Sequence, residues 1–511
     1  MAAGHPATAA ASVEILRAGG NAYDAAVAGL SAACIAEPVL ASLGGGGFLL
    51  AQPASGPATL FDFFAQTPGR ARPADELDFE PVMADFGAVQ QEFHTGLGAI
   101  ATPGMVAGLF DINKSLGRLP MRDLFAPAIT LARDGLPVAE MQSFIKHAVT
   151  PILLYSPAAK ALFESKTEAG KTLKAGEIFC MAELADCLDA LGQEGARLFY
   201  EGEIAASIEN QATGHGGSLR RTDLEAYQVI HRPPLRHSFA GYEVLSNPAP
   251  SSGGPLIAFA LALLKESAAS ARPEDAAWLD QLAHAMALTN DARRATGLDE
   301  QVDDERVARL LDSPHLSEHR HAMRNRALKI GGTTHLSVID GDGNAAAATV
   351  SNGEGCGHIL PGCGFMLNNM LGEEDINPRG FFNWLPDQRI SSMMSPTLVN
   401  RGNDQRFALG SGGSNRIRTA ILQVLCNRLA FDIEFAEAVE RPRLHYERGL
   451  LHIEHGFGED LVDILCNQYH DHKVWPERNF FFGGVHGVEL SLAHGLNGAG
   501  DSRRGGVAVR A

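Results

Sequence analysis

Two glycines and a threonine, Gly331-Gly332-Thr333, stand at the head of a segment that alternates like a β-strand, TTHLSVID over residues 333–340. A hydroxyl is a poor nucleophile unless a base removes its proton, and one solution uses the nucleophile's own α-amine. An α-amine titrates at about 7.7–8.0, so near pH 7 an appreciable share is neutral and can act as that base. This amine exists only at the start of a chain, so Thr333 requires cleavage of the Gly332–Thr333 bond. On local pattern alone, an ordinary turn into a strand is the simpler explanation.

A second candidate element is the glycine turn LGSGGS of residues 409–414. It precedes an expected helix, so the backbone N–H groups of Gly412, Gly413 and Ser414 are candidates to hold the oxyanion of a tetrahedral intermediate. Glycine turns at helix starts are common, and without Thr333 a plain strand-to-helix turn would be the simpler explanation.

Histidines before the two glycines have a spacing that suits a metal ion: His315, His319 and His321. A polar helix face accounts for them more simply, because no HExxH-like partner is present. We therefore expect no metal, and nothing in the sequence implies an organic cofactor.

Other reactive side chains lie close to the proposed nucleophile in sequence. Cys356, Cys363 and His358 would suit a cysteine nucleophile, but their glycine-rich surroundings and the lack of oxyanion donors favour a structural role. No GxSxG motif is present, which removes the α/β-hydrolase interpretation. His335 lies on the same strand face as Thr333, and a packing or orienting role is favoured because the α-amine already supplies the base.

The composition excludes several classes of partner. The chain has 511 residues, 45% of them hydrophobic, and a formal net charge of -18, which argues against nucleic acid and anionic membranes. Seven cysteines without a CxxC pair do not resemble a disulfide framework. We find no secretory signal at the start and no run of about 18 apolar residues. A cytoplasmic location is expected, or a periplasmic one if a leader precedes Met1.

The elements that must position these residues can be predicted from periodicity. Two helices are expected within residues 8–36, broken at Gly19-Gly20-Asn21, and further helices at 275–294, at 305–311 and from about 414. Strands are expected at 49–52, 242–246, 333–340, 345–350 and 406–409. The turn GDGN at 341–344 joins two of these strands into a hairpin. Strand pairs and helices without a βαβ rhythm indicate an α+β fold in layers.

Short motifs in a fixed order now connect the whole chain to a known family. They are LRAGGNAYDAAV at 16–27, SLGGGGF at 42–48, ATPGMVAG at 101–108, FYEGEIA at 199–205, NPAPSSGG at 247–254, TTHLSVID at 333–340, MLNN at 366–369, MSPT at 394–397 and the glycine turn at 410–414. In this order they resemble the γ-glutamyltransferase family. The resemblance implies a four-layer αββα sandwich of the N-terminal-nucleophile hydrolase type. It also implies self-cleavage into a large segment, 1–332, and a small catalytic segment, 333–511, that form one intertwined body.

The resemblance also suggests roles for individual residues, with Thr333 as the nucleophile and Gly412 and Gly413 as oxyanion donors. The family supports the nucleophile and binds the substrate amine from the strand that carries Thr349, Ser351 and Asn352. The remaining candidates for substrate binding are Ser392, Ser414 and one carboxylate from Glu373, Glu374 and Asp375, among which the sequence does not choose.

Two positions depart from the family pattern. In DFFAQTP, residues 62–68, Phe64 stands where the family carries an arginine for the substrate carboxylate, and Met393 replaces the second residue of a serine pair. A charge-assisted arginine–carboxylate contact contributes roughly 1.5–3 kcal/mol, which phenylalanine cannot replace. Arg70 or Arg72 are candidates to reach the same place. The segment 376–388 looks short for a covering lid, which suggests an open site.

Three hypotheses follow. The first is an autoprocessing γ-glutamyltransferase-like enzyme in which Thr333 attacks an amide donor and passes the acyl group to water or an amine. The second keeps this chemistry but acts on another amide, as an acylase does. The third is an uncleaved, non-catalytic binding protein. The expected small-molecule partners are an amide donor and its acceptor, water or an amine. The two cleaved fragments are expected to associate with each other, and this two-fragment unit could also dimerise.

Overall fold

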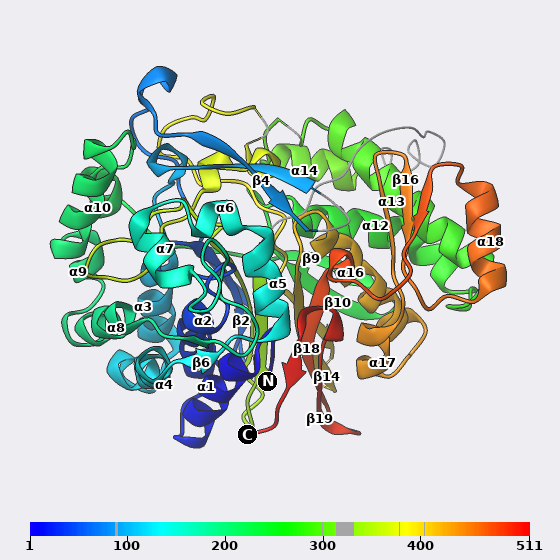
Figure 1. Cartoon of the computed structure of the whole chain (residues 1–511). Coiled ribbons are helices and arrows are strands. Elements are labelled where there is room, and N and C mark those ends of the chain that lie inside the picture. The colour runs from blue at the N-terminus through cyan, green and yellow to red at the C-terminus, as the bar shows by residue number, and fades with distance from the viewer. Residues whose placement is uncertain (87–89, 299, 313–331, 378, 403) are drawn as a thin grey trace.

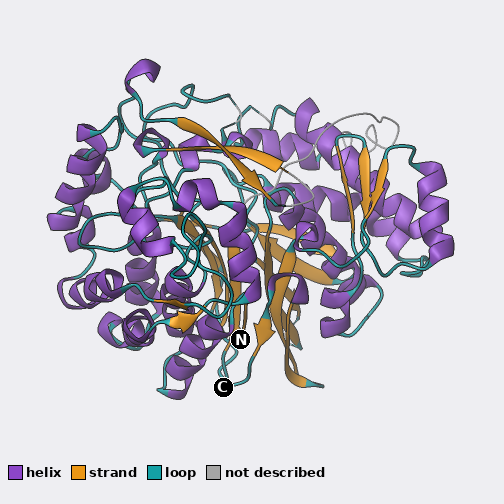
Figure 2. Ribbon diagram, in the orientation of Figure 1, coloured by secondary structure: helices purple, strands orange, loops and turns teal. Residues whose placement is uncertain are grey.

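The computed structural model describes residues 1–86, 90–298, 300–312, 332–377, 379–402 and 404–511. Two antiparallel sheets lie face to face at the centre of this part of the chain, and helices cover both outer faces (Figures 1 and 2). The described residues therefore form the expected α+β architecture with four layers, αββα.

The first sheet holds the strand that follows Thr333. In spatial order its strands are β20 (Val507–Ala508), β1 (Ala2–Ala3), β11 (Thr334–Ile339), β12 (Ala345–Ser351), β2 (Gly46–Gln52), β3 (Thr59–Phe63) and β8 (Ile230–Arg232). β11 and β12 form the predicted hairpin, with Thr334 opposite Val350. Four alanines in β12 are completely buried between a helical layer and the second sheet, which explains the need for small side chains there.

The second sheet carries the glycine turn at the end of one strand. Its order is β19 (Gly495–Gly500), β18 (Gly484–Ser491), β14 (Gln405–Gly412), β13 (Thr397–Arg401), β10 (Tyr242–Ser246) and β9 (Leu235–Phe239). β14 packs across β11 and β12 of the first sheet. The interface between the two sheets is therefore where the strand end at Thr333 and the strand end at Gly412 approach each other.

Helices from the first half of the chain cover the first sheet (Figure 1). They are α1 (Pro6–Arg17), α2 (Ala22–Ala36), α3 (Met105–Leu116), α4 (Met121–Asp134), α5 (Glu140–Ala148), α6 (Thr150–Leu153), α7 (Pro157–Phe163), α8 (Ala182–Glu194), α9 (Arg197–Tyr200), α10 (Glu203–Gly214) and α11 (Arg221–Glu225). The break between α1 and α2 lies where the sequence predicts it. Asn21 caps α2 in a capping box with Asp24, and Asp340 accepts a hydrogen bond from the Ala22 N–H, which ties the helix start to the β11–β12 hairpin.

The outer face of the second sheet is covered by helices from both halves of the chain (Figure 1). They are α12 (Gly253–Ala268), α13 (Ala276–Ala295), α14 (Asp304–Leu311), α16 (Arg416–Leu425), the π-helical turn Cys426–Ala430 and α17 (Phe435–Glu440), with α18 (Glu459–Gln468) beyond. α16 begins directly after the glycine turn and packs on β14 and β18.

Three small sheets complete the described part. They are β15 (Leu444–Glu447) with β16 (Leu450–Ile453) and β17 (His472–Val474), β4 (Glu80–Asp85) with β5 (Gln90–Thr95), and β6 (Leu136–Pro137) with β7 (Ile178–Phe179). Both central sheets combine strands from before and after residue 332, as the pairings of β1 with β11 and of β10 with β13 show. The two segments are thus interleaved.

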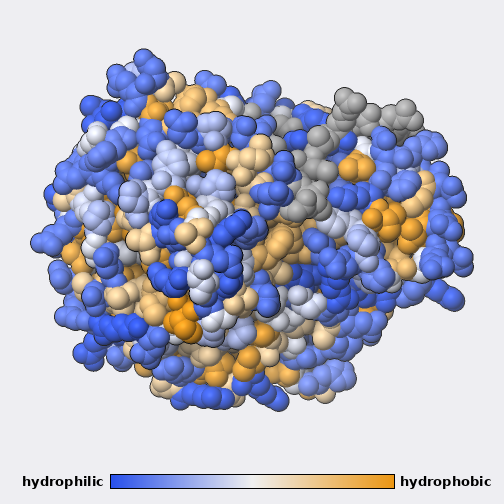
Figure 3. Space-filling view, viewed as in Figure 1, coloured by the Kyte–Doolittle hydropathy of each residue, from blue (hydrophilic) through white to orange (hydrophobic). Residues whose placement is uncertain are grey.

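Apolar residues on the face seen in Figure 3 occur in scattered small groups among hydrophilic ones. No helix within the described ranges is both long enough and apolar enough to cross a membrane.

Candidate active site

Thr333 lies immediately before β11, between the two sheets, with 6% of its surface exposed. Strand alternation places His335 on the same face, as predicted. The His335 imidazole shares hydrogen bonds with Thr349 Oγ1 at 2.7 Å and Ser337 Oγ at 2.8 Å. Burial, with a smaller contribution from His486, holds the pKa of His335 well below its usual value. A neutral imidazole with both nitrogens bonded orients neighbouring groups, which agrees with the orienting role predicted for it.

The carbonyl of Gly332 is held by Ser351, at the end of β12. Ser351 Oγ donates a hydrogen bond to this carbonyl oxygen at 2.6 Å and accepts one from the Gly353 N–H at 3.0 Å. A hydroxyl donating to a carbonyl withdraws electron density from its carbon. Ser351 is therefore placed to favour attack on the carbonyl that precedes Thr333.

The glycines at the end of β14 differ from the predicted turn. The strand was expected to end at Leu409, but it continues to Gly412, which pairs with Gly484. A Cβ atom on Gly410 would overlap the His335 ring, and one on Gly412 would overlap the carbonyl oxygen of Thr333. These two glycines therefore let β14 approach the strand that follows Thr333. The sequence alone did not suggest this reason for glycine at positions 410 and 412.

The turn itself consists of Gly413 and Ser414, and α16 starts two residues later than expected, at Arg416. Gly413 has φ +121°, which favours glycine, and Ser414 has φ 49°. The first helical bonds run from Arg416 N–H to the Gly413 carbonyl and from Ile417 N–H to the Ser414 carbonyl. Within the described ranges no acceptor is found for the N–H groups of Gly413 and Ser414. Both remain available for an oxyanion.

A small cavity of about 30 Å³ opens beside Thr333. Of the predicted site residues, it is lined by Gly332, Thr333, Ser351, Glu373, Asp375, Ser392 and Ser414. Asp375 accepts a hydrogen bond from Ser414 Oγ at 2.7 Å, which links the carboxylate to the glycine turn. The structure thus brings Glu373 and Asp375 to the cavity and leaves Glu374 exposed outside it.

Five predicted residues do not line this cavity: Gly412, Gly413, Thr349, Asn352 and Glu374. The side chain of Thr349 is completely buried and bonded to His335, because it lies deeper between the sheets than Ser351. Asn352 points its amide towards the Met366 carbonyl at 3.5 Å, and its Oδ1 lacks a partner among the described residues. Direct contact of either side chain with a substrate in the cavity is not supported by this geometry.

The two departures from the family pattern both face the cavity. Phe64 is 1% exposed and packs against Phe48 with ring centroids 5.4 Å apart, and Met393 Sδ receives a hydrogen bond from Ser252 Oγ at 3.2 Å. Neither Arg70 nor Arg72 is among the lining residues, and Arg72 instead donates to the Thr213 carbonyl at 3.0 Å. This side of the cavity is therefore apolar, apart from the Ser392 hydroxyl.

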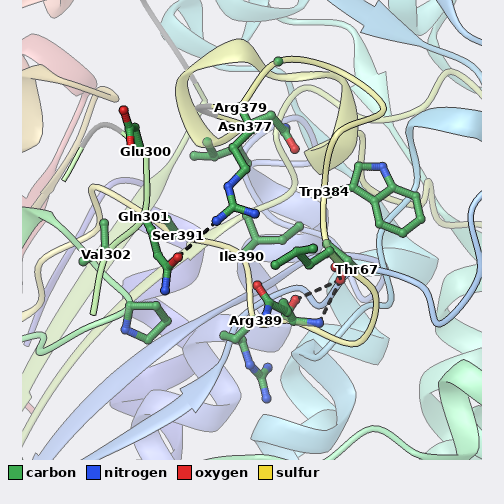
Figure 4. A pocket seen from close by; sticks show the side chains of 15 residues that line it. Thr67, Glu300, Gln301, Val302, Asn377, Arg379, Trp384, Arg389, Ile390 and Ser391 are labelled. Atoms are coloured by element: carbon green, nitrogen blue, oxygen red, sulfur yellow. Dashed lines mark hydrogen bonds between the residues drawn. The ribbon is translucent and has the colours of Figure 1, made fainter. Parts of the chain in front are cut away.

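A larger pocket of about 150 Å³ is shown in Figure 4. Ile376 lines both this pocket and the cavity beside Thr333. The segment expected to be a short lid, 376–388, supplies Arg379, Trp384 and several other wall residues. Arg379 donates to Gln301 Oε1 at 3.0 Å across the pocket. This outer pocket combines aromatic and aliphatic walls with amide and guanidinium groups at its edge.

Arg389 lines the outer pocket (Figure 4) and contacts the backbone of Phe64. Its guanidinium donates to the Phe64 carbonyl and to Tyr227, and its Nε is 3.6 Å from Asp62. The arginine nearest to Phe64 is therefore engaged by the backbone and by a buried carboxylate, and it does not replace the missing arginine in the cavity.

The sequence analysis did not identify two ionisable residues that lie near Thr333. Arg504 is buried behind the glycine turn, with its Nη1 3.5 Å from the Thr333 carbonyl oxygen, and burial lowers its pKa to about 10. Glu354 is 1% exposed and accepts a hydrogen bond from the Gly332 N–H at 2.7 Å. Arg504 lies too far along the chain for a local motif to reveal it. Glu354 is the one charged residue in the glycine-rich loop 353–357, which was the available signal.

The carboxyl groups around the cavity influence one another. Burial, followed by the charges of Glu354 and Asp375, raises the pKa of Glu373 well above its usual value. Burial also raises the pKa of Glu354 to about 8, with a further contribution from Asp375. Burial and mutual repulsion thus favour the neutral forms of Glu354 and Glu373, and a nearby cation would favour ionisation.

The remaining predictions concern metals and cysteines. Within the described ranges no group of three or more His, Cys, Asp or Glu residues is arranged to hold a metal ion, and the three predicted histidines, 315, 319 and 321, lie outside those ranges. Burial raises the pKa of Cys356 to about 12, so its thiol is a poor nucleophile.

Comparison with known proteins now identifies the family. The family model described as Gamma-glutamyltranspeptidase matches residues 8–511. The glutathione hydrolase proenzyme of Escherichia coli is 31% identical over 89% of this chain and 82% of its own length. The acylase ACY 1 proenzyme of Pseudomonas sp. strain V22 is 30% identical over 99% of this chain and 92% of its own. The cephalosporin acylase structure from Bacillus halodurans superimposes with a TM-score of 0.84 at 23% identity, covering 99% of this chain and 95% of that one, which supports the fold. The chain therefore belongs to the γ-glutamyltranspeptidase family.

Proposed function

We propose that this protein is a self-cleaving amide hydrolase or acyltransferase that cuts its own Gly332–Thr333 bond and then uses Thr333 as nucleophile. The observation that carries the proposal is the pair of donor sets around Thr333. Ser351 Oγ donates to the Gly332 carbonyl at the cavity beside Thr333, and Ser414, for whose N–H no acceptor is found among the described residues, lines the same cavity. Relatives of both kinds, glutathione hydrolase and acylase, are named as proenzymes, which agrees with self-cleavage.

In the mature enzyme, the α-amine of Thr333 takes the proton of its own hydroxyl. The hydroxyl oxygen attacks the donor's amide carbon, and the N–H groups of Gly413 and Ser414, with Gly412 adjoining, stabilise the oxyanion. The leaving amine takes the proton, and an acyl-threonine ester remains. Water or an amine acceptor then attacks this ester and regenerates the hydroxyl.

The cavity supports a donor of the acylase kind more than a γ-glutamyl amino acid. Glu373 and Asp375 line the cavity as carboxyl groups that suit an ammonium group, but Phe64 and Met393 leave an α-carboxylate without its cationic partner. An unpaired carboxylate beside apolar side chains pays a desolvation penalty. We propose an amide whose acyl group carries an amine but no α-carboxylate, with a bulkier part in the outer pocket beside Trp384.

The first experiment is an intact-mass measurement of the purified wild type and Thr333→Ala. We expect two associated fragments, beginning at Met1 and Thr333, from the wild type, and one uncut inactive chain from the variant. An uncut but active wild type, or a cleaved Ala variant, would exclude this mechanism. An uncut inactive wild type would favour the non-catalytic binding protein.

The second experiment separates donor classes. A panel of p-nitroanilides with γ-glutamyl, glutaryl, aminoacyl and simple acyl groups is compared by kcat/KM. We expect the amine-bearing acyl groups without an α-carboxylate to be preferred. A clear preference for the γ-glutamyl compound would reject the donor proposal and retain the catalytic one.

A further inference from the structure

Glu354 contacts the residue before the nucleophile and has no role in the reaction described above. It lies in the loop after β12, and its Oε1 accepts a hydrogen bond from the Gly332 N–H at 2.7 Å. Its own N–H donates to Asn369 Oδ1 at 2.9 Å, and Gly355 donates to the same oxygen at 3.1 Å. The loop that carries the carboxyl is therefore held in place from behind.

Together, Glu354 and Ser351 hold both polar groups of Gly332. Glu354 takes the N–H, and Ser351 Oγ donates to the carbonyl at 2.6 Å. A glycine without such contacts samples many backbone conformations, and each wrong one turns its carbonyl away from the attacking hydroxyl. The fit is close, because a Cβ on Gly332 would lie 2.7 Å from the Gly353 carbonyl oxygen and 3.0 Å from Glu354 Oε1.

We propose that Glu354 is a positioning residue for self-cleavage, which fixes the Gly332 peptide so that the Thr333 hydroxyl attacks its carbonyl carbon. This inference rests on the proposed function. In the step concerned, the Thr333 Oγ–C bond forms and the Gly332–Thr333 C–N bond breaks. The hydroxyl proton passes to the departing amine, and water then hydrolyses the ester to a Gly332 carboxylate and a free Thr333 hydroxyl.

The geometry predicts which property of Glu354 matters. The interaction requires an acceptor at the reach of a glutamate side chain, whereas a negative charge is dispensable, because burial already raises the pKa of this carboxyl to about 8. Glu354→Gln keeps the reach and the acceptor but loses the charge. Glu354→Asp keeps the charge but is one methylene too short, and Glu354→Ala loses both.

The test follows the rate at which freshly synthesised full-length chain converts to fragments, measured by intact mass over time. We expect Glu354→Gln to cleave within about threefold of the wild type, and Glu354→Asp and Glu354→Ala to cleave at least about tenfold more slowly, about 1.4 kcal/mol of activation free energy. Asp223→Ala is the matched control, because Asp223 also accepts a hydrogen bond from a glycine N–H, that of Gly69 at 2.9 Å, away from the cavity. It should cleave at the wild-type rate.

The melting temperature of each uncut chain separates slow cleavage from misfolding. If Glu354→Ala does not fold, the comparison of the Gln and Asp variants still decides the question. Cleavage of the Asp and Ala variants at the wild-type rate, or a Gln variant as slow as Asp, would overturn the role of Glu354 while leaving the proposed function intact. An uncut wild type would overturn both.

Discussion

At the residue scale, the site combines conventional catalytic groups with an altered specificity side. Thr333, Ser351 and Ser414 line one cavity and are suited to amide chemistry, whereas Phe64 and Met393 remove polar partners of an α-carboxylate. The unaltered groups act on the reacting carbonyl, which every donor shares. The altered ones contact the part of the acyl group that differs between donors, so a change of donor is possible without a change of mechanism.

Replacing Phe64 tests this division. We expect Phe64→Arg to raise kcat/KM for γ-glutamyl-p-nitroanilide by about tenfold, mainly through KM, since one charge-assisted hydrogen bond contributes roughly 1.5–3 kcal/mol. Phe64→Leu serves as the control for lost ring packing and should bring no gain. No improvement in a folded, self-cleaved Phe64→Arg enzyme would mean that the carboxylate is bound by other groups.

At the element scale, successive residues at the end of β14 have two different structural roles. Gly410 and Gly412 permit close contact with the strand that follows Thr333, and Gly413 with Ser414 turns the chain into α16, with no acceptor for their N–H groups among the described residues. In the proposed mechanism, self-cleavage and donor turnover depend on different elements. The β12 end holds the Gly332 carbonyl through Ser351, whereas the β14 turn carries the proposed oxyanion donors.

Gly413→Ala is the substitution that separates these elements. The residue sits at φ +121°, where any side chain strains the backbone and shifts the neighbouring donors. We expect turnover to fall roughly a hundred- to a thousand-fold while self-cleavage continues. Gly495→Ala, at φ +72° in an open turn, is the control for strain alone and should keep its turnover. Full activity in Gly413→Ala would place the oxyanion donors elsewhere.

At the scale of the whole molecule, cleavage does not divide the fold. The strands that follow Thr333 pair with strands from residues 1–332 in both sheets, so separation of the fragments would expose both sheet interiors. Behind the site, four completely or nearly completely buried charges form a network of Arg443, Glu454, Asp501 and Arg503. Asp501 contacts Arg443 at 2.6 Å and Arg503 at 3.1 Å, and these cations hold the pKa of Asp501 far below its usual value despite the opposing effect of burial.

Asp501→Asn should destabilise the protein by about 3–5 kcal/mol, because it leaves the buried Arg443 guanidinium without a direct counter-charge, whereas Arg503 keeps its ion pair with Glu454. Denaturant unfolding of the cleaved protein measures this. The depressed pKa means that the stabilisation is present above the ordinary aspartate pKa of 3.8 and is lost as the pH falls through the lower folded value, so the difference between wild type and variant should shrink in strong acid.

Asp342→Asn is the control, since the exposed Asp342–Arg118 pair should contribute less than about 1 kcal/mol. Equal stability of the wild type and Asp501→Asn near neutral pH would show that the network is not a source of stability.

Local elements could be predicted from the sequence because periodicity and capping act over a few residues. The strand at 242–246 was predicted with the bounds it has, and α13 differs by one residue at each end. The break at Gly19-Gly20-Asn21 and the β11–β12 hairpin likewise rest on neighbouring residues. The layer order and the roles of the cavity residues came from the family resemblance, since no local pattern specifies how sheets stack.

Only the tertiary structure decided which distant groups share the site. Glu373 and Asp375 line the cavity, whereas Glu374 does not. Thr349 is hydrogen-bonded to His335 instead of facing the cavity. Arg504 lies close to the Thr333 carbonyl although the two residues are 171 positions apart in the sequence. The tertiary structure also assigned Gly410 and Gly412 to close strand packing, which is a property of two sheets in contact and not of one turn. The sequence by itself determined the strand that follows Thr333, because a strand and its turns are encoded by neighbouring residues, whereas the prediction of Thr333 as nucleophile needed the family resemblance. The surroundings of the nucleophile depend on the stacking of the two sheets, which brings together residues that no short motif contains.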